Sequence, residues 1–165
     1  MGDLRPRRRP GRASSSGMSA GSGEPGGGIE IAARIPAPAD YRALELAVGF
    51  RPHDDAAISS ALENSVFVAS AFDGDRLVGV GRIVGDGAIS FLLTNLLVLP
   101  EYQRRGIGSA IVAALCERMG SLPYENMVLE VAPLAGLREF YERHGFRASG
   151  HAPPGMVRWF GGENG

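Results

Sequence analysis

The 165-residue chain contains no lysine, and all 17 of its basic residues are arginines. The absence of lysine excludes a P-loop, because that phosphate site needs a lysine after its glycines. The single cysteine, Cys116, excludes a disulfide within the chain. No apolar run approaches the roughly 18 residues that span a membrane, and no hydrophobic signal segment is evident. The sequence therefore predicts a cytoplasmic protein without membrane contact.

Charge is distributed unevenly along the chain. Residues 1–17 hold five arginines and one aspartate, a net charge of +4, and the whole chain carries −1, which leaves −5 on the remaining residues. An acidic body attracts a cationic acceptor such as an amine, and it disfavours nucleic acid as a partner. The arginine-rich segment RPRRRPGR at residues 5–12 could bind nucleic acid by itself, but a solvated extension is the simpler interpretation.

Composition divides the chain into a tail and one domain. Residues 1–28 are rich in glycine, serine, proline and arginine and hold few apolar side chains, so they cannot offset the entropy lost on ordering. We therefore expect a disordered tail over residues 1–28. Residues 29–163 are enough for a single domain with a hydrophobic core.

The most informative stretch lies near the middle of the chain. Residues 91–99 are apolar apart from Thr94 and Asn95, which predicts a strand buried on both faces, and Pro100 ends it. A polar loop and two glycines follow, and apolar residues then recur at the spacing of a helix: Ile111, Val112, Leu115 and Met119. The pattern is strand, glycine loop, helix.

This arrangement favours a bound anion. The first turn of a helix leaves backbone N–H groups without partners and carries the positive end of the helix dipole. Gly106 and Gly108 would let a phosphate approach those donors, and Arg104 and Arg105 add positive charge. The loop reads GIGSAI and lacks the GxGxxG pattern of a dinucleotide site. From spacing alone, a plain strand-to-helix turn remains an equal alternative.

The rest of the pattern predicts an α/β chain of short elements. Asp73-Gly74-Asp75 is a turn signal between two β-rich runs, residues 66–72 and 76–84, and therefore predicts an antiparallel hairpin. Strands are further predicted at residues 29–35, 88–99, 127–131, 146–148 and 156–160. A helix capped by Asp40 is predicted at residues 40–48, with Leu44 inward and Gly49 at its end. Further helices are predicted from Asp54 or Asp55, with Ile58 and Leu62 inward, and at residues 134–144.

Two segments resemble a known family. Residues 103–108, QRRGIG, fit the Q/RxxGxG/A motif, and residues 139–146, EFYERHGF, are similar to a second recurrent segment with a tyrosine at position 141. On these segments the chain resembles the GNAT family of acyl-CoA-dependent N-acetyltransferases. The resemblance implies a mixed, mostly antiparallel sheet of about six to seven strands, splayed between the fourth and fifth and flanked by about four helices. It leaves a homodimer open.

The resemblance also implies acetyl-CoA as the cosubstrate and no metal. In the family, loop amides hold the pyrophosphate of coenzyme A. The strand before the loop splays away from its neighbour at a bulge and pairs with the pantetheine arm through free backbone groups. One family feature is missing, because Leu134 occupies the position, seven residues before Tyr141, where an asparagine is often found. The implied cofactor contacts are Leu97, Val98, Leu99, Gln103, Arg104, Arg105, Gly106, Ile107, Gly108 and Ser109.

Acetyl transfer needs an acid for the departing thiolate and a base for the amine. A phenol stays protonated at neutral pH and can donate to a thiolate, so we expect Tyr141 to be the catalytic acid. Its helical spacing with Leu137, Phe140 and His144 by itself favours a packing face, and the similarity to the family segment reverses that interpretation.

The base stays unassigned. Glu45 shares a helix face with Tyr41 but is more typical of a structural or solvated residue. Asn95 is an amide and cannot act as a base, and His53 alone is typical of a surface residue.

In resembling proteins the first two helices flank the acceptor site. The expected substrate contacts are Tyr41, Glu45, Phe50, Phe91 and Asn95. The sequence thus predicts an enzyme that transfers an acetyl group directly to a primary amine of a small molecule in a ternary complex. Alternatives are acetylation of a protein lysine or N-terminus, and a non-catalytic acyl-CoA sensor.

Overall fold

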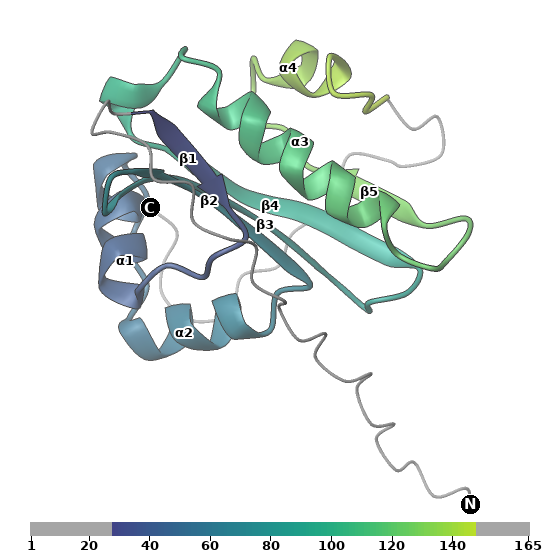
Figure 1. The fold of residues 1–165 in the computed structure, drawn as a ribbon, viewed down its shortest axis with the longest axis horizontal. Helices are drawn as coiled ribbons and strands as arrows, with labels where there is room; N and C mark the ends of the chain where they lie inside the picture. The colour runs from purple at the N-terminus through teal and green to yellow at the C-terminus, as the bar shows by residue number, and fades with distance from the viewer. Residues whose placement is uncertain (1–27, 148–165) are drawn as a thin grey trace, which may run out of the picture.

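The structure is a computed structural model that describes residues 28–147. Those residues form one sheet with helices on both of its faces (Figure 1). The strands are β1 (Ile29–Ala32), β2 (Phe67–Asp73), β3 (Arg76–Gly85), β4 (Ser90–Val98) and β5 (Val128–Val131). The helices are α1 (Pro38–Ala47), α2 (Asp55–Glu63), the short 3₁₀ helix η1 (Pro100–Tyr102), α3 (Ile107–Gly120) and α4 (Arg138–Glu142).

The strands follow one another across the sheet in the order β1-β2-β3-β4-β5. Neighbours from β1 to β4 run antiparallel, and β5 lies parallel to β4. A parallel pair needs a long crossover, and here α3 supplies it. The predicted mixed, mostly antiparallel sheet is therefore confirmed.

Turn chemistry explains the antiparallel part of the sheet. The predicted turn between β2 and β3 contains Gly74 at φ +58°, a left-handed backbone that glycine adopts without strain. The turn between β3 and β4 is held by Asp86, whose Oδ1 accepts from the N–H groups of Ala88, Ile89 and Ser90 at 2.9, 2.8 and 3.1 Å. These donors favour the carboxylate and lower the pKa of Asp86.

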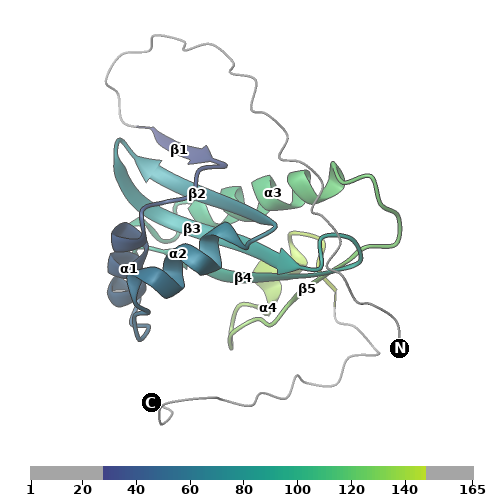
Figure 2. The same ribbon diagram turned by 90° about the horizontal axis from the view of Figure 1, so that it is seen from below.

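The helices cover both faces of the sheet (Figures 1 and 2). Helix α3 packs across β1 to β4 on one face, and α1 packs on β3 and β4 from the other, with α2 beside it. Fully buried side chains from these helices are Ile111, Val112 and Leu115 of α3, Leu44 of α1, and Ile58 and Leu62 of α2. These are residues that helical spacing placed inward.

Helix α3 approaches β3 closely because two strand positions are glycine. A Cβ on Gly81 would lie 2.7 Å from Cγ2 of Ile111, and one on Gly79 would lie 3.1 Å from Cδ1 of the same isoleucine. Neither distance leaves room for a side chain. The two glycines therefore set how near the helix lies to the sheet.

The ends of the first two helices follow local signals. Helix α1 begins at Pro38, two residues before the predicted cap Asp40, because proline at the first turn lacks only an N–H that has no helical partner there. Gly49, at φ +83°, follows the end of α1 as predicted. Asp54 caps α2, since its Oδ1 accepts from the N–H of Ala57 at 2.7 Å.

Helix α4 is shorter than predicted. It begins at Arg138 instead of Leu134, because Gly136 at φ +84° turns the chain just before it. The structure describes five of the expected six to seven strands. Residues 146 and 147 are not in a strand, and the predicted strand at residues 156–160 lies outside the described residues, as do most of the predicted tail and the end of the predicted domain.

Candidate active site

Strand β4 has a bulge at its centre. Between the Arg82–Thr94 pair and the Val80–Leu97 pair, β4 holds one residue more than β3. The bulge includes Asn95, whose backbone is left-handed at φ +51°, a conformation that asparagine tolerates better than most residues. A bulge bends its strand, so β4 changes direction here.

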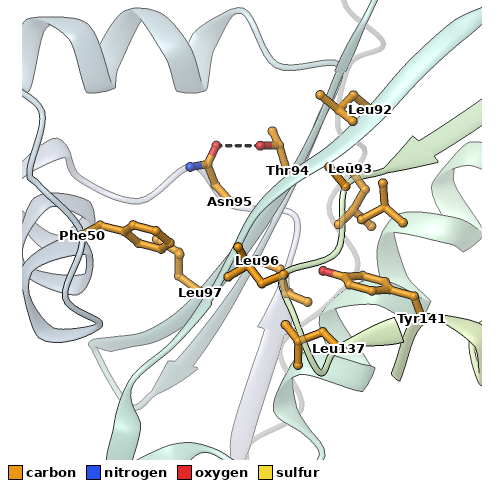
Figure 3. Close-up of a pocket in the computed structure, with 12 residues that line it drawn as sticks. Phe50, Leu92, Leu93, Thr94, Asn95, Leu96, Leu97, Leu137 and Tyr141 are labelled. Atoms are coloured by element: carbon orange, nitrogen blue, oxygen red, sulfur yellow. Dashed lines mark hydrogen bonds between the residues drawn. The ribbon is translucent and has the colours of Figure 1, made fainter. Parts of the chain in front are cut away.

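Beyond the bulge, β4 runs without β5. The parallel pairing extends from Ser90 with Val128 to Leu93 with Val131 and no further, although β4 continues to Val98. A cavity of about 230 Å³ lies where the two segments part (Figure 3). Its lining is mainly apolar and comprises residues 92–97, Val131, Ala132, Leu134, Leu137, Tyr141 and Phe50. This cavity lies at the predicted splay between the fourth and fifth strands.

Tyr141 of α4 places its phenol in this cavity. In Figure 3 the hydroxyl oxygen points toward Leu96 of β4. The ring is held edge-on by Phe140 and Phe146, with centroids 5.0 and 5.6 Å away. Tyr141 is 6% exposed, and burial raises the pKa of its phenol. Within residues 28–147 the hydroxyl has no hydrogen-bond partner, and it is not sealed from solvent.

The glycine loop directs free N–H groups toward the same end of β4. Arg104 and Gly106 have left-handed backbones, at φ +60° and +80°, and α3 begins directly after them. Among the described residues nothing accepts from the N–H groups of residues 104–109. A Cβ on Gly108 would lie 3.7 Å from Phe140 and 3.9 Å from Val98, so the protein itself leaves space there. These donors and the helix dipole suit an anion.

A second cavity, of about 70 Å³, lies near the other side of the bulge. It is lined by Tyr41, Glu45, His53, Ala57, Ile58, Ala61, Arg82 and Asn95. Asn95 therefore borders both cavities, the larger one mainly apolar and the smaller one more polar.

Arg82 organises the polar side of the bulge. Its Nε donates to Oδ1 of Asn95 at 2.9 Å, and its Nη1 donates to the carbonyl of Ala61 and to Oγ of Ser65, both at 3.3 Å. Arg82 also lowers the pKa of Tyr41, but burial raises that pKa more strongly, so the phenol of Tyr41 is neutral at physiological pH.

The family model described as the acetyltransferase (GNAT) domain matches residues 39–156. The chain belongs to the GNAT family. GNAT acetyltransferases use acetyl-CoA as cosubstrate. The resemblance inferred from residues 103–108 and 139–146 is thus confirmed at the level of the family.

Relatives and solved structures agree with this assignment. Histone acetyltransferase TAP1 of Glycine max is 29% identical over 132 residues, which cover 73% of this chain and 56% of the relative. GCN5-related N-acetyltransferase 2 of Arabidopsis thaliana, named as chloroplastic, is 28% identical over 123 residues, 62% of this chain and 46% of the relative. The chain thus spans about half the length of the curated relatives that it matches.

Two bacterial structures share the GNAT fold over nearly their whole length. A probable acetyltransferase of Staphylococcus aureus superposes with a TM-score of 0.73 at 27% identity, covering 80% of this chain and 99% of that one. A GNAT family acetyltransferase of Streptococcus pneumoniae gives a TM-score of 0.61 at 32% identity, covering 82% and 98%.

The predicted cofactor contacts at the end of β4, Leu97, Val98 and Leu99, differ in the direction of their backbone groups. The N–H of Leu99 donates to the carbonyl of Val78 at 2.9 Å, so this residue faces β3. Strand polar groups alternate in direction, so Leu97 faces β3 as well and Val98 faces the open edge. The expectation that all three residues keep free backbone groups is therefore wrong for Leu99. Of the three, only Val98 has a backbone N–H directed away from β3, toward the open edge of β4.

Gln103 also differs from the expectation. Its Nε2 donates to the carbonyl of Val98 at 3.0 Å and its backbone N–H donates to the carbonyl of Pro100 at 3.2 Å, so its backbone donor and its side-chain amide are both engaged within the protein. Gln103 ties the start of the loop to the end of β4. The free donors of the motif begin one residue later, at Arg104.

The arginines of the GNAT loop lie next to a network of exposed side chains. The guanidinium of Arg105 lies 5.1 Å from the ring centre of Tyr102, whose hydroxyl donates to Oδ2 of Asp73 at 2.7 Å. Arg76 pairs with Glu101 at 2.8 Å and lies 5.5 Å from the same ring. These contacts fix the segment after β4 against the β2–β3 hairpin.

The predicted acceptor residues are shared between the two cavities. Tyr41 and Glu45 line the smaller one, Phe50 lines the larger one, and Asn95 lines both. Phe91 lines neither cavity and is buried in the core, because it lies at the end of β4 that pairs with β5. Phe91 therefore does not join the group to which sequence reasoning assigned it.

Sequence reasoning missed the partner of Glu45. This carboxylate is 2% exposed, and its Oε1 lies 2.8 Å from Nδ1 of His53, while its Oε2 accepts from the N–H of the same residue at 3.1 Å. The available signal is weak: Gly49 follows the end of α1 four residues after Glu45, which lets the next loop fold back.

Within residues 28–147 no group of three His, Cys, Asp or Glu side chains could hold a metal ion, and no helix there is long and apolar enough to cross a membrane.

Proposed function

We propose that the chain transfers the acetyl group of acetyl-CoA to a primary amine of a small molecule, by direct transfer in a ternary complex. The observation that carries the proposal is the position of the Tyr141 hydroxyl. The ring of Tyr141 lines the larger cavity, which shares Asn95 with the smaller cavity, and the neighbouring Phe140 lies beside Gly108 of the loop. These contacts support the order diphosphate, thioester and acceptor.

The loop is proposed to hold the pyrophosphate. Six successive N–H groups, from Arg104 to Ser109, have no acceptor within the described residues, and the positive end of α3 lies among them. Gly108 leaves room for a phosphate to approach. Val98 is then the residue whose N–H can pair with the pantetheine arm as an added strand would.

Tyr141 is proposed to act as the acid. As the amine adds to the carbonyl carbon, the carbon–sulfur bond breaks and negative charge develops on sulfur. The phenol donates its proton to that sulfur. Burial holds the pKa of Tyr141 above its ordinary value near 10, so the proton is present throughout the physiological range.

The smaller cavity supports a small cationic acceptor. Its volume of about 70 Å³ suits an amine head, and the buried carboxylate of Glu45 lies on its wall. A carboxylate attracts an ammonium group, and the acidic balance outside residues 1–17 acts in the same direction. The side chain of Phe50 extends from the adjacent loop to the larger cavity.

A protein amine is the second candidate acceptor. The observation in its favour is the name of one relative, histone acetyltransferase TAP1 of Glycine max. A peptide would have to reach the bulge past Phe50. A homodimer and a cytoplasmic location also stay predictions.

The test is an assay of free thiol released from acetyl-CoA, with product masses measured. The amines are a diamine, an amino sugar and an amino-acid amide, compared with a lysine peptide and a peptide with a free N-terminus. We expect acetylation of a small amine with kcat/KM at least about tenfold above either peptide, about 1.4 kcal/mol. Transfer only to peptides would support the second candidate. Tight acetyl-CoA binding without transfer to any amine would support the non-catalytic sensor.

A further inference from the structure

We propose that His53 is the general base of the transfer, taking the proton of the acceptor amine on Nε2 while Glu45 holds the imidazole in place. The inference rests on the proposed function, because it concerns the same reaction. It assigns a role that neither the family motifs nor the comparisons give to any residue of this chain. Three observations carry it: the double contact with Glu45, the anchoring of the loop without the ring, and the place of His53 beside the bulge.

The first observation is the geometry of the pair. Nδ1 of His53 lies 2.8 Å from Oε1 of Glu45, and an ionised carboxylate is an acceptor only, so the ring proton lies on Nδ1. Nε2 is then the nitrogen with a free lone pair. The side chain of His53 is 66% exposed and that of Glu45 is 2% exposed. A buried carboxylate thus orients an imidazole whose other nitrogen is accessible.

The second observation is that the loop does not need the ring for its shape. The N–H of Phe50 donates to the carbonyl of Glu45 at 2.9 Å, and the N–H of His53 donates to Oε2 of Glu45 at 3.1 Å. Asp54 caps α2 at the far end of the loop. Backbone groups therefore fix the segment from Gly49 to Asp54, and the ring contact adds orientation of the imidazole.

The third observation is where the loop places its side chains. His53 lines the smaller cavity together with Asn95, and Asn95 lines the larger cavity together with Tyr141. Proton acceptor and proton donor therefore line two cavities that share Asn95, a residue of the bulge. An amine between them can give a proton on one side while the thioester carbon receives its lone pair on the other.

The charged groups around His53, apart from Glu45, form ion pairs or hydrogen bonds with other residues. From α1, Glu45 faces the ring, Arg42 pairs with Asp55 of α2 at 3.1 Å, and the pKa of the Tyr41 phenol is raised. From β3, Arg82 donates to three acceptors on its neighbours, and Asp54 is occupied by its helix cap. Glu45 is thus the one carboxylate among these groups that contacts the ring, and it stabilises the imidazolium formed when Nε2 takes a proton.

The proton balance of the step is as follows. Nε2 of His53 takes one proton from the ammonium, and the nitrogen lone pair forms the carbon–nitrogen bond at the acetyl carbon. The electron pair of the carbon–sulfur bond leaves with sulfur, which takes the proton of Tyr141. The second excess proton of the nitrogen returns to the Tyr141 phenolate through solvent, and His53 passes its own proton to solvent. The products are the amide, the free thiol and one proton.

Two substitutions separate the base from a structural role. His53→Asn keeps a side-chain N–H that can donate to Glu45 but has no basic nitrogen, and His53→Ala keeps only the backbone contact. We expect each to lower kcat/KM at neutral pH by at least about 100-fold. Acetyl-CoA affinity should change by less than about twofold, because His53 is not part of the glycine loop and does not line the larger cavity. Arg51→Ala, an exposed neighbour in the same loop, is the matched control with unchanged activity.

The deciding comparison uses ethylamine and trifluoroethylamine. The two are similar in size, but the fluorines withdraw electrons, so the fluorinated amine is mostly unprotonated at neutral pH and needs less help from a base. We expect His53→Asn to lose about 100-fold with ethylamine and less than about fivefold with trifluoroethylamine. Added imidazole should restore part of the activity of His53→Ala. An equal loss with both amines, or no loss with either, would overturn the inference.

Failure of this inference differs from failure of the proposed function. If the wild-type protein releases no thiol with any amine, the proposed function fails. If the wild-type protein is active and His53→Asn matches it, only the assignment of the base fails. A melting temperature of His53→Asn within about 2 °C of the wild-type value would show that the fold is intact, since that shift is well under 1 kcal/mol for a domain of this size.

Discussion

Nε of Arg82 donates a hydrogen bond to Oδ1 of Asn95 over 2.9 Å, and this bond ties the bulged residue of β4 to the neighbouring strand. Arg82 also contacts the carbonyl of Ala61 and the hydroxyl of Ser65, so one guanidinium connects α2, β3 and β4. The bulge is therefore held by a side chain as well as by the backbone. Since Asn95 borders both cavities, this contact links the stability of the fold to the shape of the site.

Substituting Asn95 tests that link. Asn95→Ala loses the bond to Arg82 and leaves an alanine in the left-handed region, so we expect the free energy of unfolding to fall by about 2–3 kcal/mol. Asn95→Gly loses the same bond but tolerates φ +51°, so its loss should be smaller by about 1 kcal/mol. Urea unfolding of both variants measures the difference. Equal stabilities would contradict a strained backbone at this position.

The elements that sequence reasoning located correctly all have a local cause. The Gly74 turn, the cap at Asp54 and the glycine loop before α3 depend on the chemistry of a few adjacent residues. Tyr141 was placed in the site by its similarity to a family segment, and the structure puts its phenol in the cavity between β4 and β5. The role of that phenol stays a prediction.

The features that sequence reasoning did not locate depend on contacts between distant segments. The resemblance implied a bulge in this strand, but nothing adjacent to Asn95 shows which residue is the extra one, because that residue is extra only relative to the register of β3. The pair of Glu45 and His53 forms only once α1 has ended and the loop has turned back. Phe91 was expected among the substrate contacts, but its place beside β5 could not be known before the sheet was assembled.

Gly108→Ala should weaken acetyl-CoA binding without harming the fold. The added Cβ would meet Phe140 at 3.7 Å, an ordinary contact, and alanine is the better helix former, so stability should stay equal or rise by up to about 1 kcal/mol. The methyl group would stand where the proposed phosphate approaches the loop donors, so the dissociation constant should rise at least about tenfold, about 1.4 kcal/mol. Calorimetric titration with acetyl-CoA measures it.

Gly120→Ala is the control for this variant. Gly120 ends the same helix, and nothing lies within 4 Å of the position its Cβ would take. Its acetyl-CoA affinity should equal that of the wild-type protein. Unchanged affinity in Gly108→Ala would count against the loop as the phosphate site.

Tyr141→Phe should separate a catalyst from a sensor. The substitution removes only the hydroxyl, so we expect turnover to fall by about 100-fold with a change in acetyl-CoA affinity below about twofold. Tyr124→Phe alters an exposed tyrosine outside both cavities and should change neither quantity. Thiol release at saturating amine measures turnover. Full activity in Tyr141→Phe would exclude the phenol as the acid.

Gly81→Ala tests the close approach of α3 to the sheet. A Cβ here would lie 2.7 Å from Cγ2 of Ile111, so we expect a loss of about 2–3 kcal/mol, the upper range for an overpacked core. Ile111→Leu removes the Cγ2 branch, so Gly81→Ala should cost less in that background. A coupling energy of at least about 1 kcal/mol in the double-mutant cycle, measured by urea unfolding, is the expected result. Additive losses would place the clash elsewhere.

The pH dependence of stability gives an independent measure of the surroundings of Tyr141. Burial raises the pKa of this phenol above the value near 10 that it has in the unfolded chain. Between those two values the unfolded state has already lost the proton that the folded state keeps, so the free energy of unfolding falls as pH rises. Below about pH 9 both states are protonated, and the phenol contributes no slope.

Tyr141→Phe removes this contribution. Between about pH 9 and about pH 11 the variant should therefore lose less stability than the wild-type protein, whereas Tyr124→Phe, which alters an exposed tyrosine, should follow the wild-type curve. Tyr41 is buried and shifted in the same direction, so it leaves a common slope in all three proteins that cancels in the comparison. If the wild-type protein and Tyr141→Phe lost stability equally over this range, the phenol would be ionising as freely as in water. A hydroxyl that ionises so freely would not occupy the buried position that the proposed proton donation to sulfur requires.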